Sequence, residues 1–538
     1  MKKLFLLLLL GFTLVGFSQT TEIPDPNFEQ ALIDLGYDTA PIDGSVLTAN
    51  ISSVTSLIVN NKNIADLTGI EDFTDLTNLY CLGNQLTSLD VSANSALEIL
   101  NCNSNQLTSL DVSANLALTT LICQENLLTD LDVTANPALT ILNCYTNQLT
   151  SVDVSLNNAL TELDFGKNQL TSLDVSNNTA LTKLFCDFNQ LTSLDVSNNT
   201  ALTELYCFAN QLTSLDVSNN PALTILNCYT NQLTSLDVSS NNALTELYCQ
   251  DNLLTDLDVT GNTQLRFLYC QDNQLTSLDV SANTALELLN CRSNQLTSLD
   301  VSNSDALTEL YCEFNQLTSL DVSNNPALTE LYCFTNQLTS LDVSSANALT
   351  GLFCFDNQLT SLDVSANTAL ELLNCYKNQL TSLDVSNNAA LTALFCYTNQ
   401  LTSLDVRNGN NTNLSPFNST SNPNLNCIYV DDASYSTANW TNIDPASTFV
   451  NNEAECALSM GDNVFELDMT IYPNPTANYL FIEGNVNPVS IYIYNLLGAK
   501  VIAKSNTNKI DVSELSKGVY IINISDGVSQ TNRKFIKN

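Results

Sequence analysis

The sequence predicts a mainly β protein: a solenoid of short parallel strands, with a helical N-terminal cap and a small C-terminal β-sandwich. The main observation is the stretch LTSLDVSxNxALTxLxCxxNQ, which recurs from about residue 79 to residue 406 with a period of 21 residues. A constant period of this length is typical of solenoids, in which each coil contacts only its neighbours. The flanking segments lose the period, and the last one alternates hydrophobic and polar residues as short strands do.

The composition excludes several classes of function. The 538 residues carry a formal charge of −40 with only 16 basic residues, so the surface would repel nucleic acid and anionic membranes. The chain has no histidine, which excludes histidine general bases, histidine-dependent triads and histidine-ligated metals. Hydrophobic residues make up 44 % of the chain, which argues against a disordered acidic tail.

Residues 1–18 have the features of a secretory signal peptide. Lys2 and Lys3 precede an apolar run over residues 4–15, and a small-residue exit follows at residues 16–18. A retained membrane anchor is the alternative, although the apolar run is short for a bilayer. No later stretch reaches spanning length, so we expect an exported mature chain without a transmembrane segment.

Residues 19–56 should cover the first coil with a helix, because that coil would otherwise expose its core. Pro26 lies near the predicted start of the helix and Gly36 at its end. The predicted apolar face of this helix comprises Phe28, Ala31, Leu32 and Leu35. The coil that follows is longer than the others, with 22 residues from Leu57 to Leu79.

Residues 57–406 form the predicted solenoid of seventeen coils. Each coil has two similar halves, LxxLxCxxN and LxxLxVxxN. Leu-x-Cys and Leu-x-Val alternate inward and outward positions, which is the period-two pattern of a short strand. We therefore predict two short strands in each coil, joined by tight corners, and two parallel sheets that enclose leucine, valine, alanine and cysteine.

Asparagine occupies both corners of the predicted coil. One column runs at 21-residue steps from Asn84 to Asn399, and a second begins at Asn94 and lapses at Ser304 and Ala346. A tight corner leaves backbone N–H and C=O groups that must be paired. Because an asparagine amide both donates and accepts hydrogen bonds, we expect the stacked asparagines to pair these groups in coil after coil.

The repeat LxxLxCxxNQLTSLDVSxN resembles the 21-residue class of the leucine-rich repeat family, LxxLxLxxNxLxxLDLxxN. The longer first coil resembles the 22-residue internalin-like class of that family. The resemblance covers about two thirds of the chain. It implies a right-handed solenoid that recognises partners, usually on its sheet surface, and it implies no catalysis.

Residues 407–458 are expected to form a C-terminal cap and loop. They begin with a stretch rich in Gly, Asn, Ser and Pro, as loops do, and residues 425–427 fit a final strand. The segment contains Trp440, the only tryptophan of the chain. Cys427 and Cys456 lie outside the repeat in an exported chain, and we predict a disulfide between them.

Residues 465–538 are predicted to form a separate β-sandwich, because strand patterns alternate with turns and seven of the 16 basic residues gather there. The distinctive positions are Tyr472, Pro473, Asn474 and Pro475, the turn ending at Gly498, then Leu515, Gly518 and Tyr520, and finally Lys534. These motifs resemble the C-terminal sorting domain of the type IX secretion system of Bacteroidetes. The resemblance implies passage through the outer membrane by that machinery, removal of the domain, and release or attachment at the cell surface. A plain β-sandwich binding module is the alternative.

Fifteen cysteines occupy the inward position of Leu-x-Cys, with Phe165 in place of the one missing member. Disulfides between adjacent coils are conceivable in an exported protein, but in-register neighbours hold their Cβ atoms about 5 Å apart and a relaxed disulfide needs about 3.8 Å. We therefore predict buried thiols that act as small hydrophobic groups. A metal site is not expected, because the ligands would have to leave the core.

Aspartate forms an unbroken column from Asp90 to Asp405 at the outward position of Leu-Asp-Val. Like charges about 5 Å apart repel by roughly 1 kcal/mol in water. Salt, neighbouring Ser and Thr hydroxyls, and shifted pKa values are expected to offset part of this repulsion. Calcium bound between coils is an alternative, although one carboxylate per coil is a sparse set of ligands.

Variation between repeats is concentrated beside the Leu-x-Cys strand. The candidate ligand-binding residues are Tyr206, Tyr248, Tyr269, Tyr311, Tyr332, Phe353 and Phe395 between leucine and cysteine, and Phe208, Tyr229, Phe334, Phe355, Tyr376 and Tyr397 after cysteine. Alternation should place the first group on one sheet face as an aromatic stripe, and exposed apolar patches usually mark binding sites. Tyrosine serves both protein interfaces and stacking on sugars. The alternative is that the stacked rings only stabilise the sheet.

Catalysis is not expected, because the aspartates repeat uniformly and a repeat surface offers no obvious cleft that excludes water. The pattern favours a secreted or outer-membrane cell-surface protein that recognises an extracellular protein or glycan through its aromatic face. The alternative is a structural adhesion rod without a specific ligand, stabilised by cations.

Overall fold

The computed structural model describes residues 19–459, 469–484, 488, 490–525 and 530–538. The chain divides into two compact units, Met1–Leu307 and Thr308–Asn538. The expected signal peptide, residues 1–18, lies outside the described residues. Among the residues that are described, no helix is long and apolar enough to cross a membrane.

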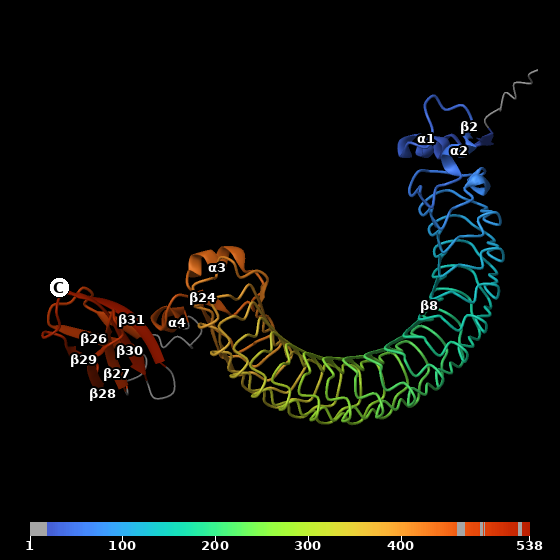
Figure 1. The fold of residues 1–538 in the computed structure, drawn as a ribbon. Helices are drawn as coiled ribbons and strands as arrows, with labels where there is room; N and C mark the ends of the chain where they lie inside the picture. The colour runs from blue at the N-terminus through green and yellow to red at the C-terminus, as the bar shows by residue number, and fades with distance from the viewer. Residues whose placement is uncertain (1–18, 460–468, 485–487, 489, 526–529) are drawn as a thin grey trace, which may run out of the picture. The chain divides into compact units, whose positions relative to one another are not determined.

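The N-terminal unit begins with a small mixed cap (Figure 1). Strands β1 (Thr20–Glu22) and β2 (Ser45–Leu47) pair antiparallel. Helix α1 (Pro26–Leu35) connects them, and the single-turn helix α2 (Thr48–Ile51) leads into the repeats.

Helix α1 begins and ends as the sequence predicts. The Asp25 side chain accepts hydrogen bonds from the first backbone N–H groups, and Gly36 ends the helix with a φ of +82°. Phe28 and Leu32 are fully buried, but Leu35 is 43 % exposed. The buried face of the helix therefore includes Phe28 and Leu32 but not Leu35, which lies in the last turn before Gly36.

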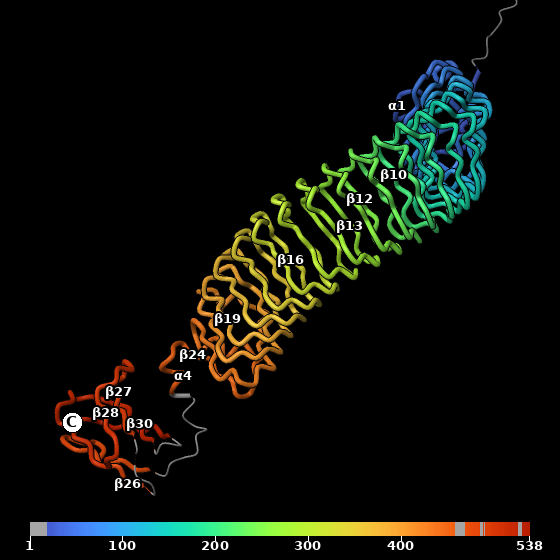
Figure 2. Tube along the Cα trace, turned by 90° about the horizontal axis from the view of Figure 1, so that it is seen from below, coloured from blue at the N-terminus to red at the C-terminus, as the bar shows by residue number. Residues whose placement is uncertain are grey.

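One strand from each coil builds a parallel sheet in the N-terminal unit, and β10, β12 and β13 show this arrangement in Figure 2. The strands are β3 (Ser56–Ile58), β4 (Asn78–Tyr80), β5 (Ile99–Asn101), β6 (Thr120–Ile122), β7 (Ile141–Asn143), β8 (Glu162–Asp164), β9 (Lys183–Phe185), β10 (Glu204–Tyr206), β11 (Ile225–Asn227), β12 (Glu246–Tyr248), β13 (Phe267–Tyr269) and β14 (Leu288–Asn290). Leu205 pairs with Leu226, the expected offset of one repeat. Leu57 pairs with Leu79 across the longer first coil, which contains the 3₁₀ turn η1 (Ile70–Asp72).

The same arrangement continues in the C-terminal unit. Its strands are β15 (Glu309–Tyr311), β16 (Glu330–Tyr332), β17 (Gly351–Phe353), β18 (Leu372–Asn374), β20 (Ala393–Phe395) and β22 (Phe417–Asn418). Leu394 pairs with Phe417, so the sheet extends one coil beyond the expected boundary at residue 406. This coil is longer than the repeat and has phenylalanine in place of leucine, which hides the period in the sequence.

The second half of each coil differs from the prediction. A second parallel sheet forms only near the end of the repeats, from β19 (Ser382–Asp384), β21 (Ser403–Asp405), β23 (Cys427–Tyr429) and β24 (Thr448–Val450). Elsewhere in the described coils this half has at most single bridges, such as Asp174 with Asp195. The prediction of two continuous sheets is therefore wrong for most coils. The backbone is paired differently here: Leu170 N donates to Asn189 Oδ1 at 2.9 Å.

Leucine, valine and cysteine fill the interior of the coils, as expected. Leu205, Cys207 and Val217 have no exposed surface. All fifteen cysteines of the repeat are buried thiols, and Phe165 is fully buried in the position of the missing one. Burial raises the pKa of the Cys228 thiol to about 12. The prediction of buried thiols is confirmed.

The first asparagine column pairs both kinds of backbone group. Asn210 Nδ2 donates to the Cys186 carbonyl at 3.0 Å and to the Cys207 carbonyl at 3.1 Å. Its Oδ1 accepts from Leu191 N at 3.0 Å. Each asparagine of this column therefore joins two coils, as predicted.

The second asparagine column pairs backbone carbonyl groups but no backbone N–H groups. Asn220 Nδ2 donates to the carbonyls of Val196 at 3.0 Å and Asn199 at 2.9 Å. Its buried Oδ1 accepts no hydrogen bond from the described residues. The two corners are therefore not equivalent, because this one presents carbonyl groups to the side chain and no N–H group.

The repeats end in a cap that contains α3 (Ala433–Asn439) and α4 (Glu453–Ser459). Trp440 is buried, stacks on Phe417 at 4.3 Å, and donates from Nε1 to the Leu414 carbonyl at 3.1 Å. Cys427 in β23 and Cys456 in α4 form a disulfide with a Cα–Cα distance of 5.7 Å. The strand expected at residues 425–427 instead occupies Cys427–Tyr429, and it is not the final one, because β24 follows and pairs with it.

The last segment is a sandwich of two antiparallel sheets. One contains β25 (Met469–Tyr472), β26 (Tyr479–Gly484) and β29 (Lys509–Asp511), and the other contains β27 (Ser490–Asn495), β28 (Lys500–Ser505), β30 (Gly518–Ser525) and β31 (Gln530–Lys537). Leu480, Ile493, Ile522 and Phe535 are fully buried in its core. The alternating pattern of the sequence thus corresponds to strands with one buried face.

Candidate functional site

Two columns of side chains stand on the outer face of the parallel sheet. We call the residues between leucine and cysteine the strand column, and the residues directly after cysteine the edge column. Leu310 in β15 and Cys312 directly after it are fully buried, while Tyr311 between them is partly exposed. Alternation along an extended backbone therefore directs the strand column toward solvent.

The predicted aromatic residues all occupy these two columns and are all partly exposed. The strand column contains Tyr206, Tyr248, Tyr269, Tyr311, Tyr332, Phe353 and Phe395, and the edge column contains Phe208, Tyr229, Phe334, Phe355, Tyr376 and Tyr397. Phe185 also belongs to the strand column, although it was not among the predicted residues. Its offset of one repeat from Tyr206 is the signal that would have identified it.

In the N-terminal unit the rings form separate short stacks. Tyr248 and Tyr269 stack with ring centroids 5.0 Å apart, and Phe208 stacks on Tyr229 at 4.4 Å. Asn227 interrupts the strand column between Tyr206 and Tyr248. The stripe is therefore divided in this unit.

In the C-terminal unit the rings form a larger surface, which we call the platform. It consists of Tyr311, Tyr332 and Phe353 in the strand column and Phe334, Phe355, Tyr376 and Tyr397 in the edge column. Successive rings of the strand column lie 4.8 and 4.2 Å apart. Those of the edge column lie 4.1, 4.4 and 4.3 Å apart. Both columns are stacked across consecutive coils, so their exposed edges form one aromatic surface.

Glutamates hold two of the tyrosine hydroxyls. The hydroxyl of Tyr248 donates to Glu246 Oε2 at 2.8 Å, and that of Tyr311 donates to Glu309 Oε2 at 2.8 Å. Partial burial, followed by the nearby glutamate, raises the pKa of both tyrosines above the usual range. These tyrosines are neutral at physiological pH, and their hydroxyl orientation is set by the glutamate two residues earlier.

Two aspartates interrupt the aromatic columns in the N-terminal unit. Asp164 replaces the ring in the strand column, and Asp187, 6 % exposed, replaces it in the edge column. Burial raises the pKa of Asp164 to about 7, although Gly166 N donates to its Oδ1 at 2.9 Å. Burial also raises the pKa of Asp187. Sequence reasoning did not identify these acids, because the pattern of a repeat does not show how deeply an outward residue is buried.

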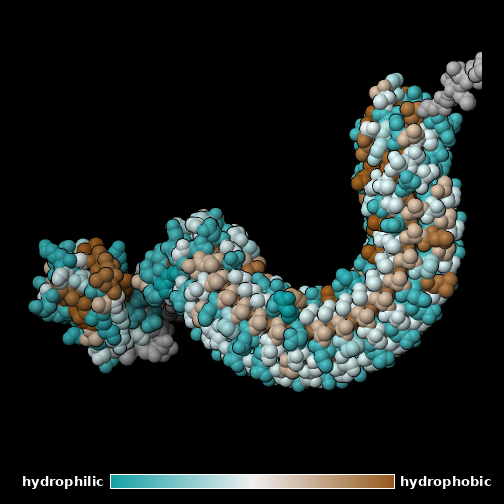
Figure 3. All heavy atoms as spheres, in the orientation of Figure 1, coloured by the Kyte–Doolittle hydropathy of each residue, from teal (hydrophilic) through white to brown (hydrophobic). Residues whose placement is uncertain are grey.

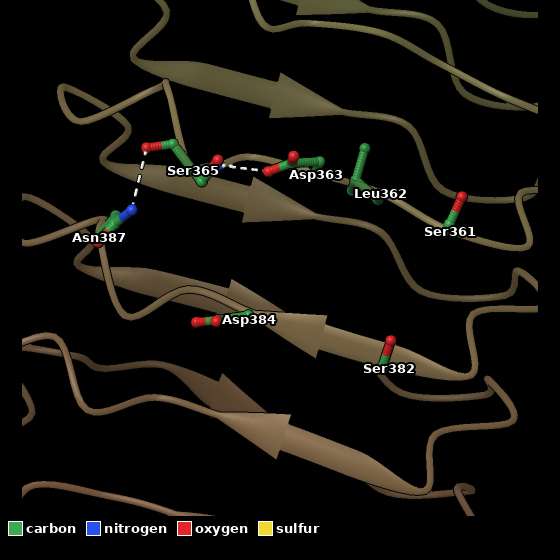
Figure 4. Close-up of a pocket in the computed structure, with 7 residues that line it drawn as sticks. All are labelled: Ser361, Leu362, Asp363, Ser365, Ser382, Asp384 and Asn387. Carbon is green, nitrogen blue, oxygen red and sulfur yellow. Dashed lines mark hydrogen bonds between the residues drawn. The ribbon is translucent and has the colours of Figure 1, made fainter.

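The opposite face of the coils carries the aspartate column. A hollow of about 380 Å³ there is lined by Ser361, Leu362, Asp363, Ser365, Ser382, Asp384 and Asn387 (Figure 4). Asp363 accepts from Ser365 N at 2.9 Å, and this hydrogen bonding lowers the pKa of Asp363. The shift that we expected from repulsion thus has the opposite sign, because the hydrogen bonds outweigh the neighbouring charge.

Similar hollows recur along this face, for example beside Asp111 and Asp132 in the N-terminal unit. They are a property of the repeat and do not mark one particular coil. Within the described residues, no three carboxylate or thiol groups come together in a way that could hold a metal ion. The surface seen in Figure 3 is a mixture of hydrophilic and near-neutral residues over the repeats, with smaller hydrophobic patches. Leu116 and Leu156 are among the exposed leucines. The aromatic columns are therefore the strongest candidate site.

The predicted sorting residues lie on loops and strand ends of the sandwich. Asn474 Nδ2 donates to the Lys534 carbonyl at 3.0 Å, and Ile536 N donates to Asn474 Oδ1 at 2.8 Å. These bonds fasten the segment that contains Tyr472, Pro473 and Pro475 to β31. Gly518 begins β30, Gly498 has a φ of +75° in its turn, and the Tyr520 hydroxyl donates to the Ser516 carbonyl at 3.0 Å.

Comparisons with known proteins agree with the predictions for the repeats and for the C-terminal segment. Residues 470–538 match a family described as the secretion system C-terminal sorting domain, which indicates export to the cell surface or the medium. The solved functional domain of InlJ from Listeria monocytogenes, described as including a cysteine ladder, is 30 % identical with a TM-score of 0.61. That match covers 97 % of this chain and 99 % of the InlJ domain.

Two further matches are more limited. YopM of Yersinia pestis, described as a leucine-rich effector protein, is 25 % identical with a TM-score of 0.51, covering 66 % of this chain and 99 % of YopM. Internalin J of Listeria monocytogenes serotype 4b is 38 % identical over 72 residues, which are 13 % of this chain. The matched region spans only 8 % of that protein's length.

Proposed function

Because the chain belongs to the leucine-rich repeat proteins of the internalin J type, we propose that it is an exported binding protein that holds an extracellular partner protein on its aromatic columns. Leu-x-Cys strands provide the scaffold, and the strand and edge columns provide the contact surface. The observation that carries this proposal is the platform, in which stacked rings remain partly exposed.

The positions that vary between repeats support this assignment. Leucine, cysteine, asparagine and aspartate recur because they build the core, the corners and the opposite face. The strand and edge columns instead carry rings, amides and charges that differ from coil to coil. Variation in the exposed residues beside the parallel sheet is what a recognition surface requires, since the scaffold does not depend on them.

Stacking also prepares these rings for binding. A ring held at about 4 Å from the next one has lost most of its rotamer freedom before a partner arrives. Aromatic side chains contribute large contact area at low entropic cost, and they dominate many protein interfaces. If the rings only stabilised the sheet, their exposed edges would have no further role.

A protein partner is favoured over a glycan by the state of the tyrosine hydroxyls. The hydroxyls of Tyr248 and Tyr311 are already bound to glutamate, so they are not available as donors to sugar hydroxyls. The exposed edges of the phenylalanines suit apolar and aromatic groups of a protein. Recognition of a glycan, and a purely structural adhesion rod, are the other outcomes that the test separates.

The test uses the full chain and the variant Y206S/Y248S/Y311S, probed on an array of purified extracellular protein domains and, in parallel, on a glycan array. The matched control, Leu116→Ser with Leu156→Ser, removes exposed apolar surface away from the columns. We expect at least one protein signal that the tyrosine variant loses by about tenfold and the control retains.

Each other outcome is informative. Binding to glycans alone would replace the protein partner with a sugar. Cell adhesion that is unchanged in the tyrosine variant, with no array signal, would support the structural rod and contradict the proposal. Circular dichroism and the melting temperature of each variant verify that the fold is retained.

A further inference from the structure

We propose that the platform of the C-terminal unit binds a basic segment of a partner protein, whose arginine side chains stack on the two rings that end the strand column, Tyr311 and Phe353, and pair with the glutamates beside them. The inference rests on the proposed function and specifies the chemistry of the partner. It is carried by three observations: carboxylates beside the rings, a shortage of basic residues around them, and arginine–aromatic–carboxylate contacts elsewhere in this chain.

Three glutamates flank the platform. Glu309 and Glu330 begin β15 and β16, two residues before Tyr311 and Tyr332, so they project from the same face as the rings. Glu371 directly precedes β18 and is exposed. In the part of the chain that the structure describes, none of these three carboxylates forms an ion pair.

The Glu330 carboxylate reaches across to the neighbouring strand. It occupies the space over Gly351 that a side chain at this position would fill. Thr350 Oγ1 donates to Glu330 Oε1 at 3.1 Å and holds it there. Gly351 is in the same strand as Phe353, so the carboxylate lies close to the third ring of the strand column. Burial raises the pKa of Glu330, which means that its charge is poorly solvated and would gain from a cation.

The charge balance around the platform favours a basic partner. Between residues 308 and 406 the chain has ten acidic residues and one basic residue, Lys377. That lysine is already paired with Asp356 at 2.8 Å. Complementary charge accelerates association and selects against acidic partners, so the surroundings of the platform select for lysine and arginine.

Arginine fits better than lysine because its planar guanidinium can stack on a ring while it donates to a carboxylate. The chain contains this contact within its own N-terminal unit. The Arg266 guanidinium lies 5.2 Å from the centroid of the Phe267 ring. Its Nε and Nη2 donate to the two carboxylate oxygens of Glu287 at 2.8 and 2.9 Å. The platform also places rings beside carboxylates, although at other positions of the coil, and its glutamates form no ion pair within the described residues.

The test measures binding of a biotinylated peptide of alternating arginine and glycine to the full chain at about 0.15 M salt, where long-range attraction is largely screened. Glu309→Gln with Glu330→Gln should weaken binding by about tenfold, since each substitution removes a carboxylate beside the rings. The matched control, Asp342→Asn with Asp363→Asn, removes the same charge from the opposite face of the C-terminal unit. We expect it to change the affinity by less than about twofold. The corresponding lysine peptide should bind more weakly than the arginine peptide.

If the glutamate variant and the aspartate variant lose the same affinity for the arginine peptide, the attraction is non-specific and the inference is overturned. Equal binding of the arginine and lysine peptides would overturn it as well. If the arginine peptide does not bind, but a partner from the protein array is lost with Y206S/Y248S/Y311S, the inference fails and the proposed function stands. If the peptide binds as expected but no extracellular protein does, the platform chemistry is supported and the proposed function is contradicted.

Discussion

The carboxylate of Glu330 lies directly over Gly351 in the next coil, so closely that a β-carbon at position 351 would collide with Glu330 Oε2. This relationship joins two residues that are one coil apart, and it keeps a negative charge beside the aromatic platform. Thr350 Oγ1 completes the arrangement by donating to the same carboxylate at 3.1 Å. The glycine therefore leaves space for the carboxylate, and its backbone conformation is one that any residue can adopt.

Replacing Gly351 with alanine should displace the Glu330 carboxylate and leave the fold intact. The colliding atom is the end of a flexible side chain, so we expect the free energy of unfolding to change by less than about 1 kcal/mol. Binding of the arginine peptide should nevertheless weaken, because the carboxylate no longer lies beside Phe353. Urea unfolding and peptide titration check the two parts. A loss of several kcal/mol in stability would show that the glycine has a structural role that we have not recognised.

Replacing Asp164 with asparagine should stabilise the protein at neutral and alkaline pH. Burial raises the pKa of Asp164 from 3.8 to about 7 in the folded state. Between these two pH values the folded protein keeps the proton on Asp164, whereas the unfolded chain has released it. Wild-type stability therefore falls as the pH rises from about 4 to about 7, by roughly 1–3 kcal/mol from this group, and asparagine avoids the loss.

Melting temperatures of wild type and Asp164→Asn between about pH 4 and pH 8 test this pH dependence. The advantage of the variant should grow across this range. Asp195→Asn is the control, because hydrogen bonding to Ser197 lowers the pKa of Asp195 and predicts no such gain. An advantage of Asp164→Asn that is independent of pH would contradict the assignment.

The two asparagine columns should respond differently to alanine. Asn210 pairs carbonyl groups and the N–H of Leu191, whereas Asn220 pairs carbonyl groups only. Asn210→Ala leaves more buried groups without partners, so we expect it to cost on the order of 3 kcal/mol, against about 1–2 kcal/mol for Asn220→Ala. Urea unfolding of both variants measures the difference. Equal losses would show that the Oδ1 contact contributes little.

The cysteines of the repeat should resist alkylation in the folded protein. All fifteen are buried, and burial raises the pKa of Cys228 and Cys375 to about 12, so little reactive thiolate is present. Iodoacetamide followed by intact mass should show no label on these cysteines before unfolding and fifteen labels after unfolding without reductant. Labelling of Cys427 and Cys456 under the same conditions would contradict the disulfide.

Salt should raise the melting temperature through the aspartate column. Hydrogen bonds keep residues such as Asp111 and Asp216 ionised, so repulsion between neighbouring coils persists until salt screens it. We expect sodium and calcium chloride at matched ionic strength to produce equal increases. A larger increase with calcium, abolished by Asp→Asn substitutions in two adjacent coils, would instead indicate calcium bound between coils.

Most of the solenoid could be predicted because its pattern is local. Leu205 and Cys207 face inward and Tyr206 outward because alternate residues of an extended chain point to opposite sides. The helix from Pro26 could be predicted from the residues that begin and end it. The coil that contains Phe417 could not, since an insertion and a substituted leucine together remove the period on which the prediction depended.

The candidate site was predicted in kind but not in extent. The sequence indicates which coils carry rings, and it does not indicate that the rings of the C-terminal unit join into one platform while those of the N-terminal unit remain divided. It also does not reveal that Asp164 is poorly solvated. Stacking and burial depend on rotamers and on neighbours one coil away, which no local pattern specifies.

By itself, the sequence determined the period, the inward leucines and thiols, the outward rings, and the sorting domain that exports the chain. Each of these follows from residue types at fixed spacing. Tertiary structure alone decided that most described coils carry one strand and not two, and that Glu330 lies over Gly351 beside the rings. The physical reason is that backbone pairing and side-chain contacts between coils are settled by packing in three dimensions, where residues distant in sequence compete for the same space.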